Sequence, residues 1–94
     1  MKTIDYMGLS DTIGLMVSVD YADRLKAEYM QATYRLMKLK KMLKDWADGV
    51  LRFEPKCDRA LYENQVKAME KYVEALGERA YAEGIILNTV YRGE

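Results

Sequence analysis

Two stretches of the chain repeat apolar residues with an unbroken spacing of four and three positions. The members of the two runs are Leu25, Tyr29, Ala32, Leu36, Leu39, Leu43 and Trp46, and then Tyr62, Val66, Met69, Val73, Leu76 and Ala80. This spacing places each run on one side of an α-helix. The sequence therefore predicts two long amphipathic helices whose apolar sides can face each other or a partner.

Capping residues set the expected limits of both helices. Asp20 is a good N-cap for the first helix, and Gly49 is available as its left-handed C-terminal cap. Asp58 can cap the second helix, which should stop at Gly84. The predicted organisation is an N-terminal arm over residues 1–18, a helical hairpin over 19–84 with helices at about 20–47 and 58–83, and a C-terminal tail over 85–94.

The segments outside the two helices lack a regular helical spacing of apolar residues. The arm contains Gly8 and Gly14 and a short β-prone run over residues 15–17, and the tail opens on the apolar residues 85–87. We expect a flexible or strand-like arm that can pair with the tail. Val50, Leu51 and Phe53 in the connector should fold back as a plug over the open end of the hairpin. The predicted fold class is all-α, an antiparallel two-helix hairpin that assembles into an oligomeric helical bundle.

Composition favours self-association and argues against several partners. Half of the 94 residues are hydrophobic, which is more apolar material than one hairpin can bury, so we expect a homo-oligomer. The 15 basic and 15 acidic residues cancel, which disfavours binding to duplex DNA. No run approaches the roughly 18 to 20 apolar residues of a membrane span. The single Cys57 is typical of a reducing cytoplasm.

Signatures of catalysis and of metal binding are missing from the sequence. The chain has no histidine, which is the commonest general base and metal ligand, and it has one cysteine. It contains no glycine-rich phosphate loop and no nucleophile elbow. We therefore expect no enzymatic activity, no metal site and no cofactor.

A second apolar stripe lies on the first helix, away from its main seam. It consists of Met30, Tyr34 and Met37, and it is bordered by five cations with no acid among them, namely Arg35, Lys38, Lys40, Lys41 and Lys44. One interpretation is a protomer interface with lysines around it, formed by Met30, Tyr34, Met37 and, from the second helix, Tyr72. The other is a binding surface for a flat, aromatic, anionic ligand. The two interpretations are compatible if the ligand lies between protomers.

In the binding interpretation, aromatic and cationic side chains divide the ligand between them. The ring of Tyr34 would stack on a base, and Arg and Lys side chains would hold phosphate. The predicted phosphate ligands are Arg35, Lys38, Lys41, Arg52 and Lys56. A weaker alternative is nucleic-acid binding by the run from Arg35 to Lys44. Tyr81, in contrast, lies on the polar face of the second helix, where it has no packing role unless the arm, the tail or another protomer covers it.

Several segments, read in order, resemble a family of small proteins. The segments are DYADRLKAEY (residues 20–29), KDWADG (44–49), FEPKC (53–57), ENQVKAMEKYVEAL (63–76) and ERAYAEGI (78–85). They are similar to small proteins encoded by tailed phages and prophages of Firmicutes, related to a crAss-like phage protein. The F-x-P-x-C connector is the most specific piece.

The resemblance implies a small accessory phage protein made in the host bacterial cytoplasm, of the kind that often counters host defence. Together with the basic, tyrosine-bearing face, it leads us to expect a protein that sequesters a nucleotide-type immune signalling molecule without catalysis. The alternative is a protein-interaction module that inhibits a host defence protein or serves as a small phage scaffold.

Overall fold

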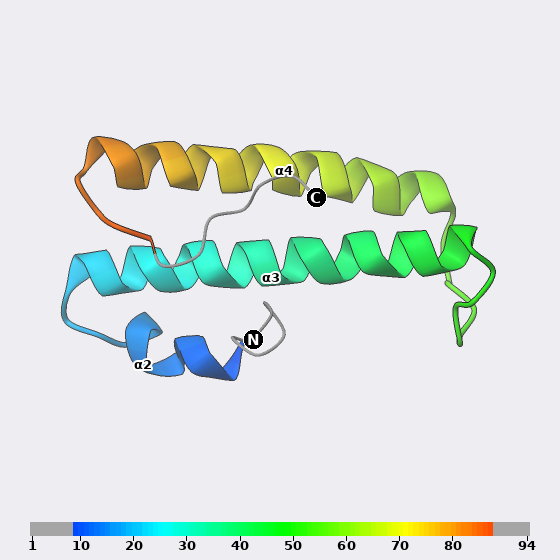
Figure 1. Ribbon diagram of the computed structural model, residues 1–94, viewed down its shortest axis with the longest axis horizontal. Coiled ribbons are helices and arrows are strands. Elements are labelled where there is room, and N and C mark those ends of the chain that lie inside the picture. Colours follow the sequence, from blue (N-terminus) through cyan, green and yellow to red (C-terminus); the bar gives the residue numbers. More distant parts are fainter. Residues whose placement is uncertain (1–8, 88–94) are drawn as a thin grey trace.

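The structure, a computed structural model, describes residues 9–87 and consists of helices joined by short connections (Figure 1). The elements are a 3₁₀ turn η1 (Ser10–Thr12) and the helices α2 (Ile13–Met16), α3 (Tyr21–Ala47) and α4 (Arg59–Ala82). The described residues contain no strand. The predicted all-α class is thus confirmed for this part of the chain. None of its helices is both long and apolar enough to cross a bilayer.

The two long helices run side by side in opposite directions (Figure 1). Contacts between them follow an antiparallel order along their whole length. Trp46, at the end of α3, meets Tyr62 near the start of α4, and Tyr21, at the start of α3, meets Arg79 near the end of α4. The described part of the molecule is therefore a two-helix layer with a short N-terminal segment packed on α3.

The core lies between α3 and α4 and is formed by the residues of the two predicted seams. Its buried members are Leu25, Tyr29, Ala32, Leu36, Val73, Leu76 and Ala80, with Val66, Met69, Ile85 and Leu87 packed against them. Leu36 is 0% exposed. Ile85 and Leu87 show that the start of the tail continues the core beyond the end of α4, because the chain turns back after Gly84.

Local capping chemistry explains where the long helices begin and end. The Asp20 carboxylate accepts a hydrogen bond from the Ala22 amide at 3.0 Å, so it caps α3 as predicted. Gly49 and Gly84 have φ angles of 74° and 73°, the left-handed conformation that favours glycine after a helix. Asp58 is the N-cap residue of α4, but its side chain makes no capping hydrogen bond.

The predicted flexible or strand-like arm is wrong for residues 10–16. These residues form η1 and α2, which pack against α3. The side-chain amide of Gln31 donates to the Thr12 hydroxyl at 2.8 Å, and Thr12 is fully buried. Tertiary packing on α3 therefore overrides the β-propensity of residues 15 and 16. The predicted arm-to-tail pairing falls largely on residues 1–8 and 88–94, which lie outside the described residues.

The predicted apolar plug over the end of the helices is also wrong. Val50 and Phe53 are 62% and 58% exposed, so they do not close the core. The connector instead folds as an open loop beside the end of α3, where it borders a shallow depression described below.

Replacement of Leu36 by alanine should lower the free energy of unfolding by about 2–5 kcal/mol, because it leaves a cavity in the thin core between α3 and α4. Urea denaturation followed by circular dichroism measures the effect. Leu61→Ala is the matched control, since Leu61 is 59% exposed and its truncation should have little effect. Equal losses for the two variants would contradict this account of the core.

Candidate functional site

The basic run on α3 is largely neutralised in the folded chain. Two of its lysines pair with acids one turn further along the helix, and a third reaches across to α4. The pairs are Lys41 with Asp45 at 3.0 Å, Lys44 with Asp48 at 2.7 Å and Lys40 with Glu70 at 3.1 Å. The hydrogen bond to Asp48 raises the pKa of Lys44. The positive field of this face is consequently weaker than the sequence alone predicts.

Tyr34 keeps a half-buried position on α3 next to its predicted partners. The Lys38 ammonium lies over the Tyr34 ring, 5.9 Å from its centroid, a cation–π geometry. Arg35 is exposed on the same helix. A base that stacks on Tyr34 would therefore have to share the ring with Lys38.

The proposed interface residues do not form one free surface. Met30 is only 7% exposed within the single chain, so it has little area to offer a second protomer. Met37 is half-buried. Tyr72 is exposed, and its hydroxyl hydrogen-bonds the Glu28 carboxylate across the two helices. The structure thus assigns Met30 to the interior of the chain and Tyr72 to a contact between α3 and α4.

A second polar contact between the two helices joins the C-terminal part of α4 to the start of α3. The Arg79 guanidinium donates to the Tyr21 hydroxyl, and this hydrogen bond raises the pKa of Arg79. Arg79 also lies 3.8 Å from Glu83. These polar contacts run along the exposed edges of the core and fix the register of the two helices.

The connector and the end of α3 border a shallow, open depression of about 440 Å³. It is lined by Trp46, Gly49, Leu51, Arg52, Phe53, Glu54 and Pro55. We call it the connector pocket. Of the predicted ligand residues, only Arg52 lines it. Two aromatic residues that were not assigned to the site from the sequence, Trp46 and Phe53, line it as well.

Trp46 is held in place by two neighbours from α4. The Tyr62 ring meets it edge to face, with centroids 6.1 Å apart and ring planes at 78°. The Arg59 guanidinium carbon lies 5.3 Å from the Trp46 ring centroid, and the same guanidinium donates to Glu63 at 2.8 Å. Trp46 is therefore a preorganised wall of the connector pocket.

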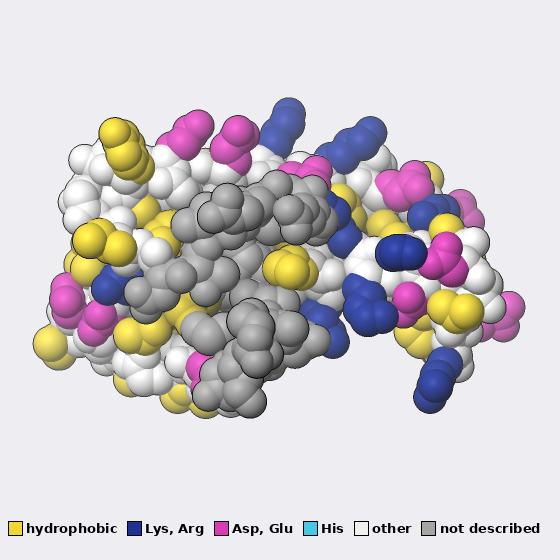
Figure 2. Space-filling view, viewed as in Figure 1, with side chains coloured by type: hydrophobic (Ala, Val, Ile, Leu, Met, Phe, Trp, Pro, Cys, Tyr) yellow, Lys and Arg dark blue, Asp and Glu magenta, His cyan; other side chains and the backbone are white. Residues whose placement is uncertain are grey.

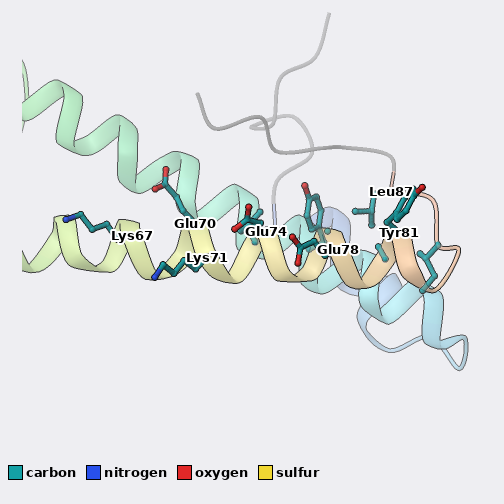
Figure 3. Close-up of a pocket in the computed structure, with 12 residues that line it drawn as sticks. Lys67, Glu70, Lys71, Glu74, Glu78, Tyr81 and Leu87 are labelled. Atoms are coloured by element: carbon teal, nitrogen blue, oxygen red, sulfur yellow. The ribbon is translucent and has the colours of Figure 1, made fainter.

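A longer groove of about 910 Å³ follows α4 (Figure 3). Apolar residues line its inner part, and charged residues of α4 line its rim. The rim carries Lys67, Glu70, Lys71, Glu74 and Glu78, while Tyr81 and Leu87 lie next to each other at one end. Among the described residues that line it, acids outnumber bases, which disfavours a phosphate-bearing ligand. The sequence analysis did not find this groove, although the exposed Tyr81 was a signal.

The fold does not gather the predicted phosphate ligands into one site. Arg35, Lys38 and Lys41 lie on α3, and Arg35 is about 18 Å along the axis from the end of that helix at Ala47. Arg52 and Lys56 lie beyond that end in the connector. Lys and Arg side chains gather over the right-hand half of the molecule but alternate with acids (Figure 2). Within residues 9–87, no three His, Cys, Asp or Glu side chains form a group that could hold a metal ion.

Comparison with known families adds one finding to this geometry. A family model described as Sequestin matches residues 19–82, which is more than half of the chain. The match spans α3, the connector and α4 and leaves out η1 and α2. No curated protein and no solved structure gives a significant match.

The Tyr62 hydroxyl, which lies under the connector, should titrate above the ordinary range of tyrosine. Its hydrogen bond with the Cys57 side chain, followed by desolvation, raises the pKa of Tyr62. The stabilisation that comes from this contact is present below a pH of about 10 and is lost as the pH rises through the raised pKa. In Cys57→Ala, the tyrosinate absorbance of Tyr62 should appear at lower pH.

Spectrophotometric pH titration measures this change, and Tyr62→Phe identifies which part of the wild-type curve belongs to Tyr62. An unchanged curve in Cys57→Ala would contradict the proposed contact.

Proposed function

The chain belongs to the Sequestin family, and on that premise we propose that it binds and sequesters a nucleotide-type immune signalling molecule without converting it. The family name denotes sequestration, and sequestration requires only a site that binds its ligand tightly. We further propose that the protein is a phage-encoded counter-defence factor that acts in the cytoplasm of the host bacterium and works as a homo-oligomer.

We place the ligand at the connector pocket. The observation that carries this choice is that two aromatic residues and an arginine, Trp46, Phe53 and Arg52, line the same pocket. Aromatic side chains stack on the faces of nucleobases, and arginine binds phosphate through paired hydrogen bonds. The volume of about 440 Å³ lies within the range of about 300–1,000 Å³ that is usual for small-molecule sites.

The fixed position of Trp46 and the exposure of Phe53 support ligand binding at the connector pocket. Trp46 is fixed by Tyr62 and Arg59, so it loses little freedom when a ligand binds beside it. Arg59 lies over the Trp46 ring, so a base that stacks on Trp46 would share the ring with this guanidinium. Phe53 is 58% exposed, an unfavourable position for a phenyl ring that a bound ligand would cover. Among the described residues, no acid forms an ion pair with Arg52, so its guanidinium is available to an anion.

The remaining predicted ligands can take part from the surroundings of the pocket. Lys56 lies in the same connector and is exposed. Tyr34, Arg35 and Lys38 lie about 14–20 Å before the end of α3 along the helix axis, and Lys41 is paired with Asp45. They contribute only if the ligand is extended or if a second protomer brings its own α3 to the pocket.

Isothermal titration calorimetry with cyclic dinucleotides and with ADP-ribose derivatives tests the proposal. We expect one of these compounds to bind the intact oligomer, and Arg52→Ala and Phe53→Ala each to weaken that binding at least about tenfold. Arg24→Ala is the matched control. Among residues 9–87, the Arg24 guanidinium hydrogen-bonds only the Ser18 carbonyl, at the far end of α3 from the pocket, so affinity should not change.

The ligand recovered after denaturation of the complex should be chemically unaltered, which distinguishes sequestration from turnover. If none of the compounds produces heat, the proposed ligand class is wrong. If one of them binds equally well to Arg52→Ala and Phe53→Ala, the ligand class stands but the connector pocket is not its site.

A further inference from the structure

Four charged side chains on α4 have no partner among the described residues. They are Lys67, Lys71, Glu74 and Glu78, all of them exposed. None forms an ion pair within residues 9–87, although lysines and acids elsewhere on α3 and α4 do. Along the upper edge of Figure 2, over α4, acidic side chains are followed by basic ones. The acids and bases of this face are thus separated into two blocks.

The four residues share one side of the helix. At 100° per residue they fall within about 60° of one another, on the side of α4 opposite the core residue Leu76. Leu76 is 1% exposed and faces α3. The charges therefore lie on the side of α4 away from Leu76, along the rim of the groove that follows this helix. We call this the outer α4 face.

The stability of the isolated helix does not explain this pattern. A glutamate before a lysine is the more favourable order within a helix, and here both lysines precede both glutamates. Acids are also disfavoured near a helix C-terminus, and Glu78 lies in the second-last turn of α4, which ends at Ala82. The arrangement is locally unfavourable in a single chain.

The same pattern is self-complementary under a two-fold axis. Lys67 and Glu78 are equally far from the centre of the row, and so are Lys71 and Glu74. If a second copy lies antiparallel along the outer α4 face, Lys67 meets Glu78 of that copy and Lys71 meets its Glu74. The symmetry repeats both contacts, which gives four ion pairs. Such a two-fold interface is the commonest kind in homo-oligomers.

Tyr81 fits the same arrangement. It is 89% exposed at the end of α4, three residues beyond Glu78. Its counterpart under the two-fold axis is Asn64, three residues before Lys67. Each Tyr81 ring would reach the aliphatic stem of Lys67 of the other copy. The two tyrosines would then close both ends of the row of ion pairs.

We propose that the outer α4 face is a homodimer interface, in which two copies of α4 pack antiparallel through these four ion pairs and the two Tyr81 rings. This interface differs from the stripe of Met30, Tyr34 and Met37 that the sequence predicted. It does not depend on the proposed sequestration, because the dimer forms without a ligand.

Two charge-reversal variants test the dimer. Lys67→Glu with Lys71→Glu makes the outer α4 face wholly acidic, and Glu74→Lys with Glu78→Lys makes it wholly basic. Each variant alone should dissociate at concentrations at least about tenfold higher than the wild type, because all four ion pairs become repulsive. Sedimentation equilibrium over a concentration series, without ligand, measures the dissociation constants.

Mixing the acidic and basic variants restores opposite charges across the interface, and formation of the heterodimer shows that both variants are folded. An equimolar mixture of the acidic and basic variants should form a heterodimer with twice the mass of the chain, and the chain with all four substitutions should again form a homodimer. The matched control is Lys44→Glu with Asp48→Lys, which exchanges an exposed ion pair of α3 and should dimerise like the wild type.

A wild-type chain that stays monomeric throughout the series would overturn the proposal. So would charge-reversed variants that dimerise like the wild type, or a mixture in which they fail to associate. Calorimetric ligand binding is a separate measurement, so a failure of the dimer and a failure of sequestration are distinguishable.

Discussion

The burial of one apolar seam against another is the constraint on which the rest of this structure depends. The core is a single row of side chains from α3 against a single row from α4, centred on residues such as Leu36 and Leu76. A layer of two helices has no third element to compensate for a loss in that row. The chain accordingly extends the core at both ends of the sequence, with the N-terminal turn packed on α3 and Ile85 and Leu87 packed beside Ala80.

Polar contacts across the helix pair give the seam its register. Glu28 with Tyr72, Tyr21 with Arg79 and Lys40 with Glu70 link the two helices along their exposed edges. Exposed contacts of this kind add little stability individually, because water competes for the same groups. Their effect is to favour one antiparallel alignment over a slip by one helical turn, which would break all of them together.

The basic run of α3, the connector pocket and the outer α4 face differ in how their charges are paired. Three cations of the basic run on α3, Lys40, Lys41 and Lys44, are balanced by Glu70, Asp45 and Asp48, so this run is a weaker anion site than the sequence alone predicts. Arg52 has no such acid among the described residues and lines the same pocket as two aromatic residues. The charges of α4 that form no ion pair within residues 9–87 lie, in turn, in separate acidic and basic blocks on the outer α4 face. These differences guide both the proposed ligand site and the proposed dimer.

The periodic spacing of apolar residues was sufficient to determine the two helices, their core sides and the glycines that end them, because these features depend on neighbours within one or two turns of the chain. Only the tertiary structure decided which lysines are neutralised, that residues 10–16 are helical, that Met30 is buried and that Trp46, Phe53 and Arg52 line one pocket. Each of these depends on contacts between segments distant in sequence or on the path of the connector, where local propensity is weak and packing selects the conformation.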